Sequence, residues 1–374
     1  MKPGPSTDYF TEFRRKAVVQ AQSAEIARWL GDRRVTLMEV CGGHTASIFR
    51  FGLRDLLPEN LALLSGPGCP VCVTPRQTID AAIACAERPD VILATFGDLV
   101  RVPGSRSTLE QVRSEGARVE IIYGADQALD LARSNPDRKV VLAGIGFETT
   151  APTSAAVVLE AESSGLDNIF LLSAHKTMPE AMEWLVSSGE VALDGFICPG
   201  HVSTIIGSQP YEFLAKDYGI ACAVAGFEPA DMLAAILLLV RQITESRPSV
   251  EVAYRRSVRP EGNPKALTIM RRVFQPGPSA WRGLGTLDGS GLDLRPEYRR
   301  FDPLGALDVE VPPSDDLSLE QEAGCRCGEV LRGVIRPTDC ALFATACTPE
   351  EPVGACMVSA EGTCRNYYTY HVQG

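Results

Sequence analysis

Eight short apolar runs alternate with amphipathic helical stretches between residues 30 and 245 of this 374-residue chain. They are rich in Val, Ile and Leu and lie at residues 34–40, 60–66, 90–97, 118–124, 139–146, 168–174, 193–200 and 219–226. Uninterrupted apolar strands separated by helices are typical of parallel sheets that are buried on both faces. The pattern therefore predicts an α/β fold.

The length of the chain exceeds that of one ordinary core, and the eight strands divide into two sets of four. We therefore predict two doubly wound parallel-sheet domains facing a cleft, at residues 31–135 and 136–245, after an N-terminal helical segment at 1–30. Residues 246–374 are predicted to form a loop-rich C-terminal domain, in which 275–318, rich in Pro, Gly and Asp, forms extended loops and turns.

The bulk composition argues against several classes of protein. A net charge of −11 disfavours nonspecific binding to nucleic acid, because the phosphate backbone would be repelled. The N-terminus lacks the apolar core of a secretory signal. The most apolar run, residues 232–240, is far shorter than the roughly 20 residues that span a bilayer, so it is predicted to be a core helix. We expect a cytoplasmic protein without nucleic-acid or membrane partners.

The twelve cysteines are informative in that compartment. Structural disulfides are rare in a reducing environment, so clustered cysteines there indicate metal or redox chemistry. Cys85 and Cys222 lie singly in apolar runs and are expected to pack in the core as small hydrophobes.

Five motifs that contain Cys, His, Glu or Gly follow predicted strands. They are CGGHT (41–45), GPGCPVC (66–72), GFETTAP (146–152), SAHKT (173–177) and CPGHVST (198–204). Ligands of open α/β sheets bind at the carboxyl ends of the strands. We therefore expect Glu148, His175 and His201, with the first two motifs, to line one cleft.

In CGGHT, the two glycines allow a tight turn before a helix whose dipole favours a thiolate at Cys41, with His44 beside it as a proton donor or acceptor. In GPGCPVC, Cys69 and Cys72 have the C-x-x-C spacing of dithiol redox centres and of half a zinc site. The chain has no second C-x-x-C or H-x-x-H pair, which disfavours zinc, whereas a reversible disulfide, iron ligation and simple packing remain open. Glu148 alone is better explained as a helix cap than as a catalytic acid.

Six cysteines lie in the last 50 residues. Cys325, Cys340, Cys347 and Cys364 have the spacing C-x14-C-x6-C-x16-C, and Cys327 and Cys356 remain. Four thiolates suit either tetrahedral zinc or a [4Fe–4S] cluster, and spacing does not separate the two.

Taken together, CGGHT, GPGCPVCVTP, GFETTAP, CPGHVSTIIG and the terminal cysteines resemble the HypD family of hydrogenase maturation factors, from about residue 10 to the C-terminus. The resemblance implies two α/β domains, a cluster-bearing third domain, and a scaffold on which the Fe(CN)2CO moiety of [NiFe]-hydrogenase is assembled, rather than a conventional turnover enzyme. Its partners would be the chaperone HypC and, transiently, the cyanide donor HypE.

The resemblance also implies residue roles. Cys41 would ligate the iron that carries CN and CO, with His44 assisting, and Cys69 and Cys72 would form a redox-active pair. A [4Fe–4S] cluster would be held by Cys325, Cys340, Cys347 and Cys364. Two alternatives from other classes are a cytoplasmic thiol–disulfide oxidoreductase acting on proteins through Cys69–Cys72, and a zinc hydrolase using His44, His175 and His201.

Overall fold

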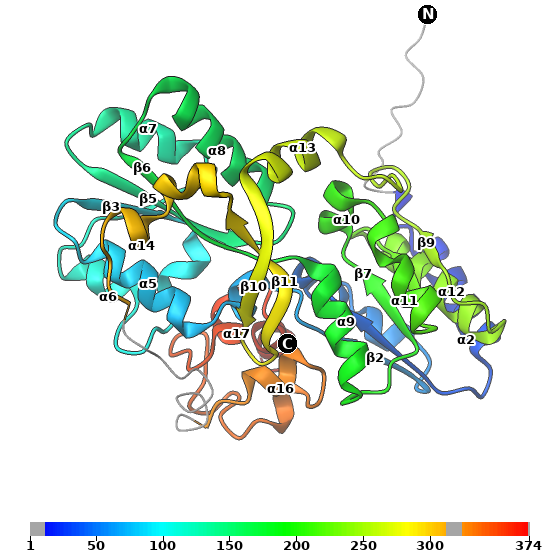
Figure 1. The fold of residues 1–374 in the computed structure, drawn as a ribbon. Coiled ribbons are helices and arrows are strands. Elements are labelled where there is room, and N and C mark those ends of the chain that lie inside the picture. Colours follow the sequence, from blue (N-terminus) through cyan, green and yellow to red (C-terminus); the bar gives the residue numbers. More distant parts are fainter. Residues whose placement is uncertain (1–11, 312–323, 373–374) are drawn as a thin grey trace, which may run out of the picture.

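The computed structural model describes residues 12–311 and 324–372, and it contains two parallel sheets that lie side by side (Figure 1). The larger sheet, here called sheet A, has the strand order β2 (Leu61–Ser65), β1 (Val35–Glu39), β7 (Gly195–Cys198), β8 (Ala221–Val224) and β9 (Val250–Val252). Sheet B has the order β4 (Val119–Ile121), β3 (Val91–Thr95), β5 (Lys139–Gly146) and β6 (Ile169–His175). The predicted α/β class with two parallel sheets is confirmed.

Helices cover both faces of sheet A because alternate side chains of its buried strands point to opposite faces. Phe196 and Cys222 face α9 (Met178–Ser188) and α11 (Glu212–Asp217). Ile197 and Ala223 face the opposite helices, α2 (Lys16–Leu30), α3 (Gly42–Arg50) and α12 (Pro229–Thr244). The run 232–240 lies inside α12, as predicted. Among the described residues, no helix combines the length and the apolar character needed to cross a membrane.

Sheet B is covered in the same way. On one face lie α7 (Gln127–Ser134), α8 (Ala151–Ser164) and α13 (Pro264–Val273). On the other lie α5 (Arg76–Ala86) and α6 (Leu109–Ser114), whose core includes Cys85 at 0% exposure. Cys222 is equally buried in sheet A, so the core positions expected for these two cysteines are confirmed.

The expected grouping of the strands by chain order is wrong. Strands β1 and β2 pair with β7, β8 and β9, while β3 to β6 form the other sheet. The chain leaves sheet A after β2 through α4 (Pro70–Val73) and α5, and it returns after β6 through α9. A division into residues 31–135 and 136–245 therefore coincides with neither sheet. An apolar run indicates that a strand is buried but not which strand it pairs with. The sequence pattern therefore could not show where the chain passes from one sheet to the other.

Residues 275–318 were expected to be loops and turns, but the first part of this range belongs to an antiparallel hairpin of β10 (Phe274–Trp281) and β11 (Gly285–Leu294). Its register shifts between Gly277 and Ser279, and such a bulge admits the Pro and Gly residues that concealed the strands. The hairpin crosses the middle of the molecule between the two sheets (Figure 1).

The C-terminal segment is loop-rich, as expected, and lies below the hairpin in the view of Figure 1. Its short helices are α16 (Cys327–Leu331), α17 (Ala355–Val358) and α18 (Thr363–Tyr367). Two short helical pieces follow the hairpin, at Pro296–Phe301 and Pro303–Ala306 (α14). A final turn runs from Tyr368 to Val372. Residues 312–318 of the predicted loop lie outside the described residues.

Candidate functional site: three groups of cysteines at the edge of sheet A

Three neighbouring strands of sheet A carry the candidate residues at their carboxyl ends. Cys69 and Cys72 follow β2, Cys41 and His44 follow β1, and His201 follows β7. Because these strands are adjacent and parallel, the loops after them meet at one edge, as the strand-end rule predicted.

Cys41 lies between the end of β1 and the start of α3 and is 7% exposed. Its backbone N–H donates to Glu39 Oε2 at 3.0 Å, and the carboxyl of Glu39 also accepts from Thr45 Oγ1. Burial raises the pKa of Glu39 to about 7. Burial, with Glu361 and Glu39 nearby, also raises the pKa of the Cys41 thiol. The thiolate expected from the helix dipole is therefore not favoured, because burial and two carboxyl groups outweigh the N-terminus of α3.

His44 does not hydrogen-bond to the Cys41 sulfur; its Nε2 donates to the carbonyl of Ala225 at 3.2 Å. Since a carbonyl oxygen can only accept, Nε2 carries the ring proton. Burial lowers the pKa of His44 to about 3, so the ring is neutral. Its Nδ1 is a buried acceptor without a hydrogen-bond partner among the described residues.

Phe227 follows β8 and brings the two histidine loops together. Its ring centroid lies 4.9 Å from that of His44 and 3.9 Å from that of His201. A Cβ atom on Gly43 would stand 3.0 Å from the ring, and one on Gly200 would stand 3.1 Å from it. The sequence interpretation missed Phe227, although GFEP follows a predicted strand as the other motifs do.

The loops after β1 and β2 touch backbone to backbone. Gly42 N donates to Gly68 O at 2.9 Å, and a Cβ on Gly68 would lie 2.1 Å from Cys41 N. On its other side, a Cβ on Gly42 would lie 2.4 Å from Cβ of Glu361, which belongs to the C-terminal segment. Both glycines are therefore required by close approach, and the Cys41 loop is held between the C-x-x-C loop and the C-terminal cysteine segment.

Cys69 and Cys72 form a disulfide across the one-turn helix α4, with Cα atoms 5.2 Å apart. Their exposures are 3% and 0%. The Sγ of Cys72 lies 3.9 Å from the carbonyl oxygen of Ala355, at the start of α17. The pair is thus covered by the segment that carries Cys356.

All six C-terminal cysteines line one small cavity, together with apolar side chains that include Leu342 and Phe343. Neighbouring thiols influence one another in this cavity: Cys325 and Cys356 lower the pKa of the Cys327 thiol, whereas Cys327 and Cys364 raise the pKa of the Cys356 thiol. The Sγ of Cys347 accepts from Val353 N at 3.4 Å.

The donor set of this cavity fits an iron–sulfur cluster. Four of its thiols would suffice as soft ligands, and a Cβ on Gly354 would stand 2.7 Å from the sulfur of Cys325, so the cavity wall is kept open there. In residues 12–311 and 324–372, no three His, Cys, Asp or Glu side chains converge tightly enough to hold a single metal ion. A cluster takes one thiolate per iron and so needs a ring of thiols around a cavity rather than one tight tetrahedron.

The motifs after β5 and β6 lie in sheet B, and their polar groups have local partners. Glu148 Oε1 accepts from Met178 N at 3.0 Å, and burial raises the pKa of this carboxyl to about 8. The Nε2 of His175 lies 3.1 Å from Ser154 Oγ, and burial lowers the pKa of its ring to about 3. Lys176 Nζ donates to the carbonyl of Ala280 at 2.6 Å.

His175 is therefore not brought together with His44 and His201, and the three-histidine zinc site is not formed among the described residues. Glu148 is linked to the disulfide only through packing, because its neighbour Phe147 lies in the same apolar cluster as Cys69 and Cys72. Its hydrogen bond to the first residue of α9 agrees with the capping role, although the helix capped is α9 rather than its own.

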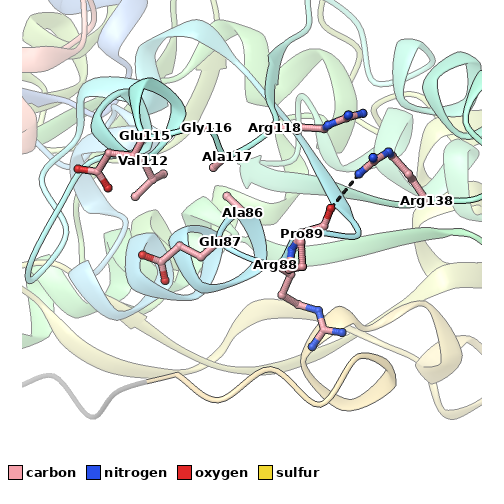
Figure 2. Close-up of a pocket in the computed structure, with 10 residues that line it drawn as sticks. All are labelled: Ala86, Glu87, Arg88, Pro89, Val112, Glu115, Gly116, Ala117, Arg118 and Arg138. Carbon is pink, nitrogen blue, oxygen red and sulfur yellow. Dashed lines mark hydrogen bonds between the residues drawn. The ribbon is translucent and has the colours of Figure 1, made fainter.

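A cavity of about 410 Å3 lies at the other end of sheet B, where β3, β4 and β5 begin (Figure 2). Arg88, Arg118 and Arg138 precede these strands and line it, and Arg138 Nη1 donates to Pro89 O at 2.8 Å. Because it opens at the amino ends of the strands, it is separate from the cysteine loops.

Comparison with known proteins places this arrangement in a family. The chain matches the family model HypD, described as the hydrogenase formation hypA family, over residues 16–371. It is 44% identical over 369 residues to the hydrogenase maturation factor HypD of Rhodobacter capsulatus, covering 97% of this chain and 98% of that protein. It is 45% identical over 370 residues to the HypD of Azotobacter vinelandii, covering 97% and 96%. A putative hydrogenase expression/formation protein of Methanocaldococcus jannaschii is 44% identical over 337 residues, covering 90% and 92%. The chain therefore belongs to the HypD family of hydrogenase maturation factors.

Proposed function

We propose that this chain is a cytoplasmic scaffold on which an iron ion receives its CN and CO ligands, with HypC as its partner and HypE as a transient cyanide donor. One observation carries the proposal: the loop of Cys41 is in contact with both the C-x-x-C loop, through Gly68, and the C-terminal cysteine segment, through Glu361. A ligand for the cargo iron, a disulfide and a ring of thiols thus share one region.

Cys41 is the proposed ligand of the cargo iron. A thiol must lose its proton to bind a metal, and the raised pKa of Cys41 keeps that proton in place until the metal arrives. Glu39, whose pKa is near neutrality, is placed to take up the proton, whereas burial keeps the His44 ring neutral and makes it a weak base. The site therefore couples iron binding to proton release.

The proposed redox element is the Cys69–Cys72 disulfide. Its reduction breaks the S–S bond and consumes two electrons and two protons, which gives two thiols. A low-potential one-electron carrier is the class of reductant that the proposal requires. When bound, a [4Fe–4S] cluster supplies one-electron chemistry. Cys325, Cys340, Cys347 and Cys364 would hold it, as the resemblance to the family implies, and all four line the cavity.

The burial of the disulfide separates this proposal from a protein thiol–disulfide oxidoreductase. Such an enzyme needs an attacking sulfur that a protein substrate can reach. Cys69 and Cys72 are 3% and 0% exposed, and α17 lies against Cys72. Exchange of electrons with groups inside this chain fits the buried position of the disulfide better than attack on an external protein.

The test is infrared and Mössbauer spectroscopy of the chain purified anaerobically with HypC. Wild type is expected to show cyanide and carbonyl stretching bands and cluster iron. The Cys41→Ala variant is expected to lose the bands while keeping the cluster signal, and Cys85→Ala, which removes a buried core thiol of α5, is expected to keep both. Bands that persist in Cys41→Ala would contradict the role of Cys41, and anaerobic wild type without iron would contradict the cluster.

A further inference from the structure

Arg282, at the tip of the β10–β11 hairpin, contacts the end of the helix that carries Cys72. Its backbone N–H donates to Val73 O at 2.8 Å, and its Nε donates to Thr74 O at 3.1 Å. Val73 is the last residue of α4, so these two bonds satisfy carbonyl groups at the end of that helix. The side chain is 3% exposed although it carries a full charge.

The same hairpin tip contacts the helix that carries Cys327. A Cβ on Gly283 would stand 2.5 Å from the Cα of Gly328, and Arg332 Nη1 donates to Gly283 O at 2.6 Å. One tip therefore connects the disulfide helix α4 with the cavity helix α16.

These contacts close a ring around the disulfide. Cys72 lies against Ala355 of α17, and the next residue, Cys356, shares an apolar cluster with Cys327 of α16. Helix α16 packs on the hairpin tip, which returns to α4 through Arg282. Cys69, Cys72, Cys327 and Cys356 also belong to one apolar cluster with Trp281 and Leu284. A charge held among apolar side chains acts more strongly on its neighbours than a charge in water.

We propose that Arg282 is the positioning residue that sets the reduction equilibrium of the Cys69–Cys72 pair. Reduction converts a neutral disulfide into two thiols, and loss of a proton from either one gives a thiolate. A buried guanidinium at the end of α4 stabilises that thiolate and so favours the reduced pair. The inference rests on the redox role in the proposed function and adds to it the residue that tunes the pair.

The test is a redox titration of the full chain, purified anaerobically, against a small dithiol. Each protein disulfide reduced yields one oxidised molecule of the reagent, so electrons and protons balance. After alkylation, residues 55–76 form one tryptic peptide whose only cysteines are Cys69 and Cys72, which separates their state from that of the cavity thiols.

Arg282→Gln removes the charge but keeps an amide donor, and it is expected to lower the equilibrium constant for reduction about tenfold. Arg282→Lys keeps the charge and is expected to stay within about threefold of wild type. Arg332→Gln, which removes a cation from the other side of the same tip, is the matched control and is expected to match wild type. If Arg282→Gln does not fold, Arg282→Met, whose side chain suits the apolar cluster, carries the same expectation.

The inference is overturned if the neutral variants titrate like wild type. It is also overturned if Arg282→Lys falls as far as Arg282→Gln, because charge would then not be the cause. A wild-type pair that does not titrate reversibly contradicts the redox part of the proposed function instead, so the two failures are distinguishable.

Discussion

The backbone of Gly68 lies so close to that of Cys41 that a single added carbon at Gly68 would stand 2.1 Å from the Cys41 nitrogen. The atoms it would meet belong to the main chain and cannot swing away as a flexible side chain can. We expect Gly68→Ala to lower the free energy of unfolding by about 3 kcal/mol and to separate the Cys41 loop from the C-x-x-C loop. Thermal and denaturant unfolding measure the first effect. Gly305→Ala, where nothing lies within 4 Å, should change stability by less than about 0.5 kcal/mol.

Burial raises the pKa of Glu148 to about 8 from an ordinary value of 4.5. The folded state therefore holds this proton more tightly than the unfolded state, and the resulting stability is full below pH 4.5 and is lost as pH rises toward about 8. Glu148→Gln keeps the acceptor for Met178 N and should flatten this slope, by up to about 1.4 kcal/mol per pH unit. Urea unfolding across this pH range measures it, with the exposed Glu115→Gln as control. An unchanged slope would count against a buried, protonated Glu148.

Single substitutions of the six cavity cysteines should separate those that bind the cluster from those that do not. Cys325→Ser, Cys340→Ser, Cys347→Ser and Cys364→Ser are each expected to reduce bound iron and acid-labile sulfide from about four per chain to near zero, because a cubane cluster has one protein ligand per iron. Cys327→Ala and Cys356→Ala should retain both. Iron and sulfide analysis after anaerobic purification decides, and loss of iron from either alanine variant would reassign the ligands.

Phe227 packs against the Cys41 loop at Gly43. A Cβ atom added to Gly43 would lie 3.0 Å from the Phe227 ring and 3.7 Å from the Cys41 sulfur. We expect Phe227→Ala to cost about 3 kcal/mol of stability and to speed alkylation of Cys41 by iodoacetamide, because the ring no longer fills the space between the two histidine loops. Residues 35–50 form a tryptic peptide with Cys41 as its only cysteine, so mass spectrometry can follow the rate. Phe301→Ala removes a buried ring beside sheet B and should leave that rate unchanged.

The sequence predicted the strands and the edge at which the site lies, and the physical reasons are clear. Each of the eight apolar runs overlaps one of β1 to β8, since strands buried on both faces must be apolar along their length. Cys41, Cys69 and Cys72 were placed correctly because carboxyl ends of parallel strands share an edge. The pairing of β1 with β7 could not be predicted, because no local pattern records which distant strand is the neighbour.

The same limit explains the site residues that sequence interpretation missed. Glu361 and Arg282 reach the cysteine loops from segments far away in the chain, and neither belongs to a motif with Cys, His or Gly at a strand end. The environment of Cys41 was also misjudged, because the helix dipole is visible in a sequence whereas burial beside Glu39 and Glu361 is not.

The order of the strands has a consequence for biosynthesis. Strands β1 and β2 leave the ribosome early, but their sheet is completed only by β7, β8 and β9, after all four strands of sheet B have been made. Sheet B is thus nested inside sheet A along the chain, and truncation at any point between β2 and β9 leaves sheet A without some of its strands. A nascent chain must keep the apolar strands β1 and β2 from aggregating while the inserted sheet forms, and the disulfide helix α4, which lies at the first crossing, cannot reach its final surroundings until the C-terminal segment arrives.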